Sequence, residues 1–402
     1  MNFEMHINRC QIMDELPLEV VERKGRGHPD TICDLLAERI SYDLGHYYLK
    51  TCGRVLHYNV DKALLVGGRS RPQFGGGEIL EPAKLYLGDR AISNFNGKDL
   101  GLNNVVQNSI QSWLKENLRF LRIGKTLEWK SEIKPGSSVL NSVEEKNVAN
   151  DTSVGVGYWP LSTLESLTIE IEELLNSPVY RTKYPELGED TKIMSIRRGR
   201  SIEIILACAF VDQYVSGVDD YVEKKRRALE TLRADLTEKY KNRFDLSLSL
   251  NALDDPSRGL DGLYLTVTGL SCEGGDSGQV GRGNRVSGLI SFMRPQTMEA
   301  WAGKNFKTHV GKIYSFAAQG LAKALVENVD EISESTVTLV GKIGSPVHEP
   351  LYVLSDFKIK NGNESKIQEK VHATLKRAIA SKDIFQPEAL FHLSRKEISY
   401  GI

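Results

Sequence analysis

The sequence predicts an α+β fold, in which helices cover one face of mixed β-sheets. Two observations support this prediction. Helix-like and strand-like segments are both frequent, yet they do not alternate one for one, as a doubly wound parallel sheet requires. The chain of 402 residues is also too long for one ordinary hydrophobic core, so two or three domains are expected.

Helical periodicity is clearest in PDTICDLLAERISYDL, where an aliphatic residue recurs every four positions. Those residues are Ile32, Leu36, Ile40 and Leu44. The same kind of spacing returns in LSTLESLTIEIEELL, whose apolar face is formed by Leu161, Leu164, Ile171 and Leu175. Further helices are expected at 219–241, 309–326 and 365–380.

Five segments are rich in β-branched and aromatic residues and are bounded by glycine, serine or charged residues, which predicts strands. They are 54–68, 201–211, 263–269, 335–344 and 351–357. The alternation within SIEIILACAFV is imperfect, so this strand is expected to be largely covered on both faces. Segment 128–151 is expected to form a loop or crossover.

The composition is that of an ordinary globular protein, with 40% hydrophobic and 26% charged residues. The formal net charge of −1 provides no general attraction for nucleic acid or an anionic membrane, so any anion site must be built locally. The N-terminus carries acids where a signal peptide needs an apolar run, and no run approaches the ~20 apolar residues of a membrane span. We therefore expect a cytoplasmic protein that binds neither nucleic acid nor membrane.

The five cysteines, at positions 10, 33, 52, 208 and 272, are odd in number and widely scattered. None belongs to a CxxC pair or lies at ligand spacing from a histidine. Small buried thiols in a reducing compartment are therefore favoured over zinc ligands or disulfides.

VERKGRGHPD is the first of four polar, glycine-rich segments. Pro29 suits the first turn of a helix, where its missing N–H is not needed, and Asp30 would then lie near the helix N-terminus. A simple helix cap explains that much. His28 and the neighbouring cations are not needed for a cap, and a helix N-terminus with adjacent cations is a ready phosphate site. Both interpretations stay open on this segment alone.

The second segment, VGGRSRPQFGGGE, contains three consecutive glycines, Gly75, Gly76 and Gly77. Such a run makes a flexible turn, or it lets the backbone approach a ligand closely. A hairpin is the favoured interpretation.

The third segment, GGDSGQVGRGNRVSG, has features of a dinucleotide fingerprint, a phosphate loop and an RNA-binding tail. The fingerprint needs a glycine where Val286 stands, and the phosphate loop needs a lysine where Asn284 stands. An RNA tail is not expected inside the chain, directly after a strand and with acidic residues. What remains is a structured loop that suits a metal–phosphate site, with an acid for the metal and arginines for the oxygens. These residues are Asp276, Arg282 and Arg285.

The fourth segment, WAGKNFKTHVGK, places three lysines and a histidine in a loop that leads into a helix. Lysines near a helix surface are commonly only solvated, so this reading competes with a phosphate site. Taken together, four loops rich in Gly, Lys, Arg, His and Asp within a nearly neutral protein indicate polyphosphate chemistry with magnesium.

At GHPD, GGDSGQVGRGNRVSG and MEAWAGKNFKTHVGKIY the sequence resembles methionine adenosyltransferase, the S-adenosylmethionine synthetase family, in its archaeal-type branch. The likeness continues through ERKGRGHPDTICDLLAERIS, FGGG, NDTSVGVGYWPLS and LGEDTKIM, and it covers nearly the whole chain in order. GHPD alone is unspecific, whereas several ordered segments of this length are specific.

The resemblance implies an enzyme that joins methionine to ATP and yields S-adenosylmethionine, pyrophosphate and phosphate. It implies three similar α+β domains in a pseudo-threefold arrangement, interlocked at a dimer interface. A homodimer or a dimer of dimers, with active sites between subunits, and two Mg²⁺ ions together with K⁺ are also implied. We expect the domains at 1–125 with the GHPD and GGG loops, at 126–258 with NDTS and GEDTK, and at 259–402 with the third and fourth segments; some segments exchange between domains.

This chemistry explains the residue types. A neutral thioether needs no general base, so the barrier lies in the departure of the triphosphate, which preorganised cations and metal ions stabilise. By resemblance, His28 would lie at the bridging oxygen, while Asp30 and Asp276 would hold the Mg²⁺ ions.

The resemblance assigns roles to further residues. Lys192, Arg282 and Lys304 would be catalytic with His28 and would grip the phosphates. Taken alone, Lys192 reads as a surface lysine after an acidic turn. Asp151 would pair with the methionine ammonium, and Asp190 would contact the ribose. Additional phosphate-binding candidates are Arg285, His309 and Lys312.

Some positions depart from the family pattern. Gly283 stands where bacterial and eukaryotic members have a lysine, and Arg285 is the expected substitute for that charge. A second lysine and an aspartate of that branch have no clear match, and part of their role is expected of His309 and Lys312. Differences from the archaeal-type pattern lie at Arg26, Val60-Asp61-Lys62, Val154 and the residue after Asn305.

These differences lie close to the substrate loops and leave alternatives open. Valine in place of an aromatic residue at 154 would enlarge a pocket beside methionine or adenine, so a relaxed S-alkyl preference is one alternative. A non-catalytic paralogue is another, disfavoured because the expected site residues are present. An RNA-binding module is opposed by the balanced charge.

Overall fold

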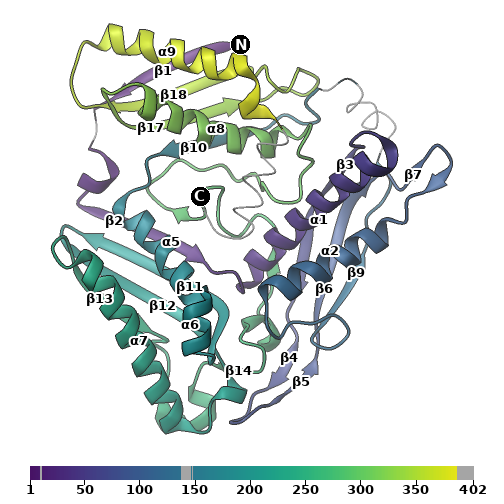
Figure 1. Ribbon diagram of the computed structural model, residues 1–402, viewed down its shortest axis with the longest axis vertical. Helices are drawn as coiled ribbons and strands as arrows, with labels where there is room; N and C mark the ends of the chain where they lie inside the picture. Colours follow the sequence, from purple (N-terminus) through teal and green to yellow (C-terminus); the bar gives the residue numbers. More distant parts are fainter. Residues whose placement is uncertain (10, 137–145, 147, 387–402) are drawn as a thin grey trace.

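The computed structural model describes residues 1–9, 11–136, 146 and 148–386. Its three larger sheets are each packed against long helices, so the fold is α+β, as predicted (Figure 1). In each of these sheets one edge strand runs parallel to its neighbour, while the next pairs along the sheet are antiparallel. The sheets are therefore mixed, which also agrees with the prediction.

One order of elements recurs three times when the small elements are left aside: helix, two antiparallel strands, helix, parallel edge strand. The first set is α1 (Pro29–Cys52), β3 (Tyr58–Val66), β6 (Ala83–Ala91), α2 (Leu102–Asn117) and β9 (Leu127–Ser131). The second is α5 (Thr163–Asn176), β11 (Leu187–Arg198), β12 (Ser201–Val211), α7 (Val218–Tyr240) and β13 (Asp245–Leu250). The third is α8 (Val310–Asn328), β17 (Ile332–Val340), β18 (Tyr352–Ile359), α9 (Glu364–Ser381) and β1 (Asn2–Asn8), which comes from the start of the chain.

Strands from elsewhere in the chain complete each sheet. The strand β15 (Gly278–Gln279) pairs with β3, and β10 (Val154–Trp159) pairs with β17. The second sheet gains β2 (Leu18–Lys24), β14 (Leu265–Thr266) and β16 (Ile290–Ser291). As a result, each of the expected segments 1–125, 126–258 and 259–402 contributes strands to all three sheets.

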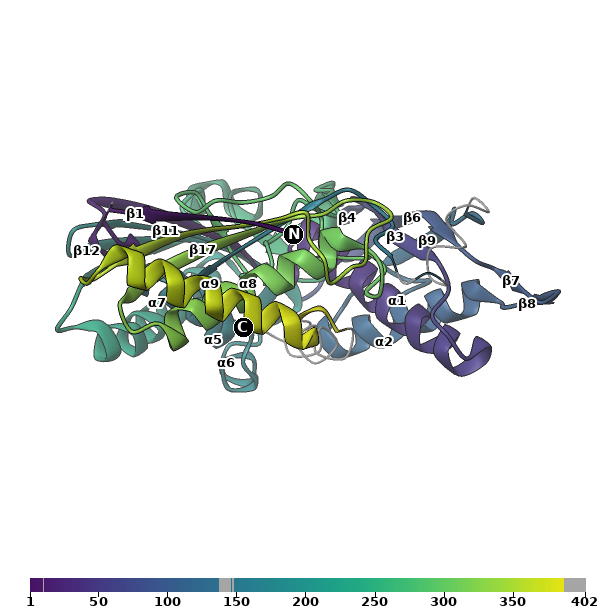
Figure 2. The same ribbon diagram turned by 90° about the horizontal axis from the view of Figure 1, so that it is seen from above.

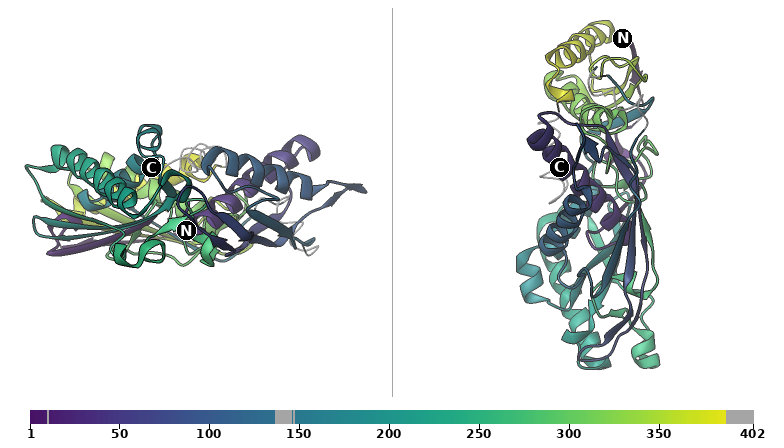
Figure 3. Two further views of the ribbon diagram at one scale, coloured as in Figure 1. Left: turned by 90° about the horizontal axis from the view of Figure 1, so that it is seen from below. Right: turned by 90° about the vertical axis from the view of Figure 1, so that its right-hand side faces the viewer.

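The helices lie on one side of the molecule and the sheets on the other, as seen from above and from the side (Figures 2 and 3). Three separate hydrophobic cores fill the spaces between the sheets and their helices. The aliphatic residues that repeat every four positions in α1 are completely buried in the first core, which confirms the predicted helix. In the described part of the chain, no α-helix covers the opposite faces of the sheets.

Several predicted elements differ from the structure. All five predicted helices form, but α2 and the short α6 (Pro178–Lys183) are additional. The helix α2 buries Val106, Ile110 and Trp113, but Asn, Gln and Ser between them obscure its pattern. The predicted strand at 263–269 is reduced to the two residues of β14, which has one short parallel partner.

The strand β12 alternates between exposed and buried residues over 201–207, whereas every residue from 208 to 211 is buried. The prediction of a largely covered strand is therefore wrong for its first half, because the helices cover only one face of this sheet. Within the predicted loop at 128–151, residues 128–131 belong to β9, and 137–145 and 147 lie outside the described residues.

The three consecutive glycines lie in a hairpin between β4 (Arg69–Arg71) and β5 (Glu78–Glu81), which confirms the favoured interpretation. Gly75 and Gly76 have φ angles of 84° and 121°, a region that glycine enters at no steric cost. The Asp212 carboxylate accepts the Gly77 N–H at 2.7 Å and holds the hairpin. A second small hairpin joins β7 (Asn94–Phe95) and β8 (Lys98–Asp99).

Two further predictions concern thiols and membranes. The four described cysteines, Cys33, Cys52, Cys208 and Cys272, are free thiols, while Cys10 lies outside the described residues. Within the described part of the chain, no helix is both long enough and apolar enough to cross a membrane.

Candidate active site

Three loops converge at the N-terminus of α1: the segment before the helix, the start of β11, and the loop 271–285. Glycines allow this convergence. A Cβ at Gly27 would lie 2.4 Å from the carbonyl carbon of Glu189, and one at Gly278 would lie 2.1 Å from that of Pro29. Real Cβ atoms do not approach so closely, so a larger residue at either position would push the loops apart.

His28 caps α1, and its ring Nδ1 accepts the Asp30 N–H at 3.2 Å. Burial lowers the pKa of His28 to about 4, with Lys24 and Lys192 adding to the effect and Asp30 and Asp276 opposing it. The ring is therefore neutral at neutral pH. Because Nδ1 is an acceptor, the proton of the neutral ring lies on Nε2, which becomes a hydrogen-bond donor.

The Asp30 carboxylate joins the helix to the loop that follows β14. Its Oδ1 accepts the Gln279 N–H at 2.9 Å, and its Oδ2 lies 2.9 Å from the Lys24 ammonium. Lys24 also donates to the carbonyl of Arg282 at 2.7 Å. Lys24 thus holds the Asp30 carboxylate and the Arg282 backbone together.

Ser271 connects two further acids. Its N–H and Oγ both donate toward the Asp190 Oδ2, at 2.8 and 2.5 Å, and its Oγ lies 3.0 Å from the Asp276 Oδ2. Asp190 is buried, and burial raises its pKa to about 7 despite the bonds from Ser271. Asp276 is exposed, as expected for a metal-binding loop residue.

Two of the expected phosphate-binding cations are accessible. The Lys192 side chain on β11 is 47% exposed, with its Nζ 3.5 Å from the Glu22 Oε2. The Arg282 side chain is exposed and has no hydrogen-bond or ion-pair partner among the described residues. We call His28, Asp30 and Asp276 the α1 cluster. The charge of Lys192 acts on His28, and the Arg282 backbone is tied to the cluster through Lys24.

Lys304, His309 and Asp151 belong to a second group. The buried Lys304 ammonium lies 2.6 Å from the Asp61 Oδ2 and 3.2 Å from the Glu299 Oε2. His309 caps α8, and its Nε2 lies 3.5 Å from the Asp151 Oδ2. Burial lowers the pKa of His309 well below its ordinary value, and the nearby lysines reinforce this. We call this group the α8 cluster.

Two expected phosphate-binding residues are occupied inside the protein. Lys312 is buried and donates to both carboxylate oxygens of Glu38, at 2.8 and 2.6 Å. Arg285 points back into its own loop and donates to the carbonyls of Gly281 and Gly283, at 2.5 and 2.9 Å. Neither side chain is free for a ligand in this arrangement.

The helix α1 links the two clusters, since Asp30 belongs to the first and Glu38 reaches the second through Lys312. Eight residues of α-helix separate them by about 12 Å.

Sequence reasoning did not single out Asp34 or Glu38, although Asp30, Asp34 and Glu38 follow one another at intervals of four and share a helix face. It also did not single out Ser271 or Glu299, for which no local pattern exists. Val154 opens β10, opposite Val340, and is partly buried.

The donor set of the α1 cluster suits magnesium. No group of three or more His, Cys, Asp or Glu side chains poised to hold a metal occurs among the described residues. Mg²⁺ does not need one, because it commonly keeps several waters and takes one or two carboxylates together with substrate phosphates. Asp276 is exposed and Asp30 uses only part of its acceptor capacity, so both fit that role.

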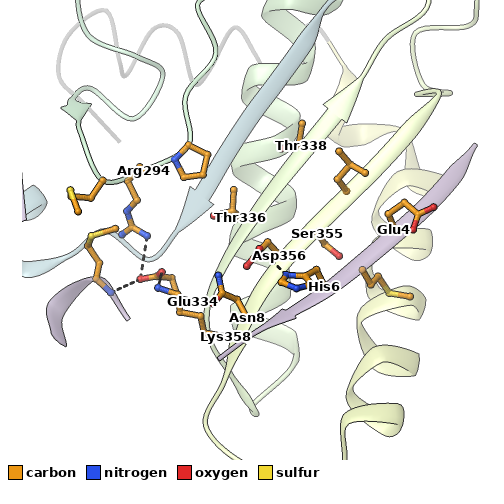
Figure 4. Close-up of a pocket in the computed structure, with 15 residues that line it drawn as sticks. Glu4, His6, Asn8, Arg294, Glu334, Thr336, Thr338, Ser355, Asp356 and Lys358 are labelled. Carbon is orange, nitrogen blue, oxygen red and sulfur yellow. Dashed lines mark hydrogen bonds and ion pairs between the residues drawn. The ribbon is translucent and has the colours of Figure 1, made fainter. Parts of the chain in front are cut away.

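An open pocket of about 620 Å³ lies elsewhere, on the outer face of the third sheet (Figure 4). Its basic side chains are paired with acidic side chains of the same pocket. His6 lies 3.1 Å from Asp356, and Glu334 lies 3.2 Å from Arg294 and 2.7 Å from Lys358. None of the expected site residues lines this pocket. Since its cations are already neutralised, the α1 cluster is the better candidate for polyphosphate chemistry.

Comparison with known proteins points to one family. The sequence profile described as S-adenosylmethionine synthetase (AdoMet synthetase) matches residues 2–389. The chain is 43% identical to a probable S-adenosylmethionine synthase of Aquifex aeolicus, over 88% of each chain. It is 41% identical to the S-adenosylmethionine synthase of Hyperthermus butylicus, over 85% of this chain and 86% of the relative.

The fold is similar to a solved structure described as an unusual S-adenosylmethionine synthetase from Campylobacter jejuni. The TM-score is 0.57 at 16% sequence identity, with 94% of this chain and 90% of that chain covered. At this identity the likeness concerns the fold alone, and it agrees with the α+β architecture described above.

Proposed function

The chain belongs to the S-adenosylmethionine synthetase family, and we propose that it acts as an ATP:L-methionine S-adenosyltransferase. It is a transferase that makes S-adenosylmethionine, in a family whose reaction uses ATP with metal ions. The observation that supports this specific activity is the α1 cluster, because the charge of Lys192 acts on His28 and the backbone of the exposed Arg282 is tied to Asp30 through Lys24.

In the proposed reaction the methionine sulfur attacks C5′ of ATP. The S–C5′ bond forms while the C5′–O bond breaks, and the bonding electron pair leaves with the triphosphate. Hydrolysis of the triphosphate then yields pyrophosphate and phosphate. The thioether is already nucleophilic, so the residues of the site are needed to stabilise the departing anion rather than to remove a proton.

His28 is suited to the bridging oxygen. Its pKa of about 4 keeps the ring neutral, and its Nδ1 is occupied by the Asp30 N–H. The Nε2–H therefore remains to donate a hydrogen bond to the oxygen that leaves C5′. A neutral donor stabilises the growing charge there without transferring a proton.

Lys192 and Arg282 supply the accessible positive charge. We propose that both grip the triphosphate oxygens, Arg282 through the two-pronged geometry of its guanidinium. Two Mg²⁺ ions, held by Asp30 and Asp276, would supply further positive charge when bound. K⁺ is a proposed second cofactor. Asp190 is the proposed ribose contact, and its bond from Ser271 would orient it.

The α8 cluster is the proposed methionine side of the site, with Asp151 for the ammonium group and Lys304 as a further cation. Within one chain its ion pairs are made with Asp61, Glu299 and Asp151, none of which belongs to the α1 cluster. We propose a homodimer, or a dimer of dimers, in which the site is completed between subunits. In this view Arg285 and Lys312 support the site from inside, because their donors are directed to protein groups.

A product assay tests the proposal directly. Purified protein with ATP, methionine, Mg²⁺ and K⁺ is expected to form S-adenosylmethionine and phosphate. Asp276→Asn and Arg282→Ala are each expected to lower the rate by about 100-fold or more, since each removes a charge contact with the leaving group. Their free energies of unfolding should change by less than about 0.5 kcal/mol, because both residues are exposed.

The outcomes separate the alternatives. If ATP binds but no S-adenosylmethionine forms, the non-catalytic paralogue becomes the better account. If the wild-type protein is active and either variant retains the wild-type rate, the assignment of the α1 cluster is wrong.

A further inference from the structure

Three carboxylates lie in a row on the buried side of α1. Asp30, Asp34 and Glu38 follow one another at intervals of four residues, and each is at most 6% exposed. Each accepts a backbone N–H from a loop that arrives much later in the sequence. The bond from Gln279 to Asp30 is 2.9 Å, that from Gly281 to Asp34 is 2.7 Å, and that from Gly303 to Glu38 is 3.0 Å.

Asp34 is the middle member and is not assigned to any step of the reaction. Its side chain is 3% exposed, so substrate does not reach it directly. Burial raises the pKa of Asp34 to about 7, although the Gly281 N–H and the charge of Arg285 favour its ionised form. A buried carboxylate that is only partly compensated is expensive to keep, which indicates a role beyond packing.

Asp34 and Arg285 both bind the same short piece of backbone. Asp34 accepts the N–H of Gly281, and Arg285 donates to the carbonyls of Gly281 and Gly283. A Cβ at Gly283 would lie 2.2 Å from the Asp34 Oδ2, so the loop touches the carboxylate at this residue as well. Arg282 lies between these two anchored glycines.

We propose that Asp34 is a positioning residue, which together with Arg285 fixes the backbone of Gly281–Gly283 and so directs Arg282 toward the α1 cluster. This inference rests on the proposed function, because it takes Arg282 as the residue that grips the triphosphate. It explains why a lysine is not needed at position 283. Glycine is required at position 283 because a side chain there would collide with the Asp34 carboxylate. The positive charge is supplied instead by Arg285, on the inner side of the loop.

A double-mutant cycle tests whether Asp34 acts through Arg282. Asp34→Ala removes the acceptor of the Gly281 N–H and is expected to lower kcat by about 10- to 100-fold, as a misplaced catalytic group does. In the Arg282→Ala background the same change should lower kcat by less than about threefold, because the residue being positioned is already absent. Asp34→Asn keeps an oxygen for the Gly281 N–H and is expected to recover most of the activity.

Asp43→Asn is the matched control, since Asp43 lies on the same helix in a surface ion pair with Arg39 at 2.9 Å. It is expected to leave kcat unchanged in both backgrounds. If Asp34→Ala lowers kcat equally with and without Arg282, the residue has only a structural role and the inference is wrong. Wild-type kcat in Asp34→Ala also overturns it.

Hydrogen exchange gives a readout that does not depend on activity. The Gly281 N–H should be protected in the wild-type protein and in Asp34→Asn, and it should exchange faster in Asp34→Ala. Unchanged protection of the Gly281 N–H in Asp34→Ala contradicts the inference, whether or not the proposed reaction is correct. If Asp34→Ala does not fold, Gly283→Ala perturbs the same contact, and its loss of kcat must likewise disappear in the Arg282→Ala background.

Discussion

At the scale of single residues, Asp61 and Asp89 show how one carboxylate changes another. They lie on the neighbouring strands β3 and β6, and the Asn59 amide donates to both, at 2.9 and 3.0 Å. Burial opposes the charge on Asp61, but Lys304, Lys62 and the hydrogen bond with Asp89 together outweigh it and lower the pKa of Asp61. Burial and the neighbouring Asp61 then raise the pKa of Asp89 to about 6.

The raised pKa of Asp89 predicts a pH effect on stability. Between pH 3.8, its ordinary pKa, and about 6, the folded protein holds a proton that the unfolded chain has lost. The contribution of Asp89 to the free energy of unfolding therefore falls as pH rises through this window. Asp89→Asn has no such proton, so its free energy of unfolding relative to wild type should rise between pH 4 and 7.

Denaturant unfolding at several pH values measures this difference. The native φ of 88° at residue 89 suits asparagine, so backbone strain does not complicate the comparison. Asp330→Asn, at an exposed position, is the control and should give a constant difference from wild type. A constant difference for Asp89→Asn would show that its carboxyl titrates alike in both states.

At the scale of elements, the N-terminus of α5 is fixed by a capping box. The Ser162 Oγ accepts the Glu165 N–H at 3.0 Å, and the Glu165 carboxylate accepts the Ser162 N–H at 2.7 Å. The same hydroxyl donates to the buried carboxylate of Glu19 on β2. One serine therefore starts the helix and also satisfies a buried acid of the sheet beneath it.

Ser162→Ala is expected to destabilise the protein by about 2–3 kcal/mol, because it removes the cap and one donor to Glu19. Ser177→Ala is the matched comparison. Ser177 caps α6 by accepting the Tyr180 N–H at 3.2 Å, but its hydroxyl donates only to the carbonyl of Leu174 in the described residues. Its loss should destabilise by about 1 kcal/mol. Urea unfolding of both variants measures these losses of stability. Equal losses in the two variants would argue against the role given to Glu19.

At the scale of the whole molecule, the uncovered faces of the sheets carry large apolar side chains. Leu64 and Tyr86 on the first sheet, Ile205 on the second and Leu354 on the third are each exposed by more than a third. All belong to strands whose other face is covered by helices. Leu64 and Tyr86 are paired across β3 and β6. Grouped exposed apolar side chains mark an interaction site, which agrees with the proposed homodimer.

Light scattering should therefore give a mass of at least twice the 44.9 kDa of one chain. Leu64→Glu places a charge on the exposed sheet face and is expected to shift the protein toward monomer and reduce its activity. Leu49→Glu is the matched control, because Leu49 is 43% exposed on α1 and Leu64 is 42% exposed on β3. A monomeric wild-type protein, or the same dissociation in Leu49→Glu, would contradict the proposal.

The local features of this protein can be predicted from its amino-acid sequence. The spacing of Ile32, Leu36 and Ile40 predicts a helix because one face of an α-helix is repeated every three to four residues, and the structure buries that face. The consecutive glycines predicted a hairpin for a similarly local reason. Four polar loops in a neutral chain indicated an anion site, and the resemblance identified the family, which the comparisons confirm.

The contacts between distant segments of the chain become visible only in the folded structure. The sequence around β1 does not show that this strand pairs with β18. Likewise, the sequence around Asp34 does not show that its carboxylate accepts the N–H of Gly281, which lies 247 positions later. Arg285 and Lys312 have the residue types of phosphate ligands, yet their donors turn inward to protein groups. A charged side chain binds whatever acceptor the fold brings to it, and that acceptor is set by long-range packing, not by its neighbours in sequence.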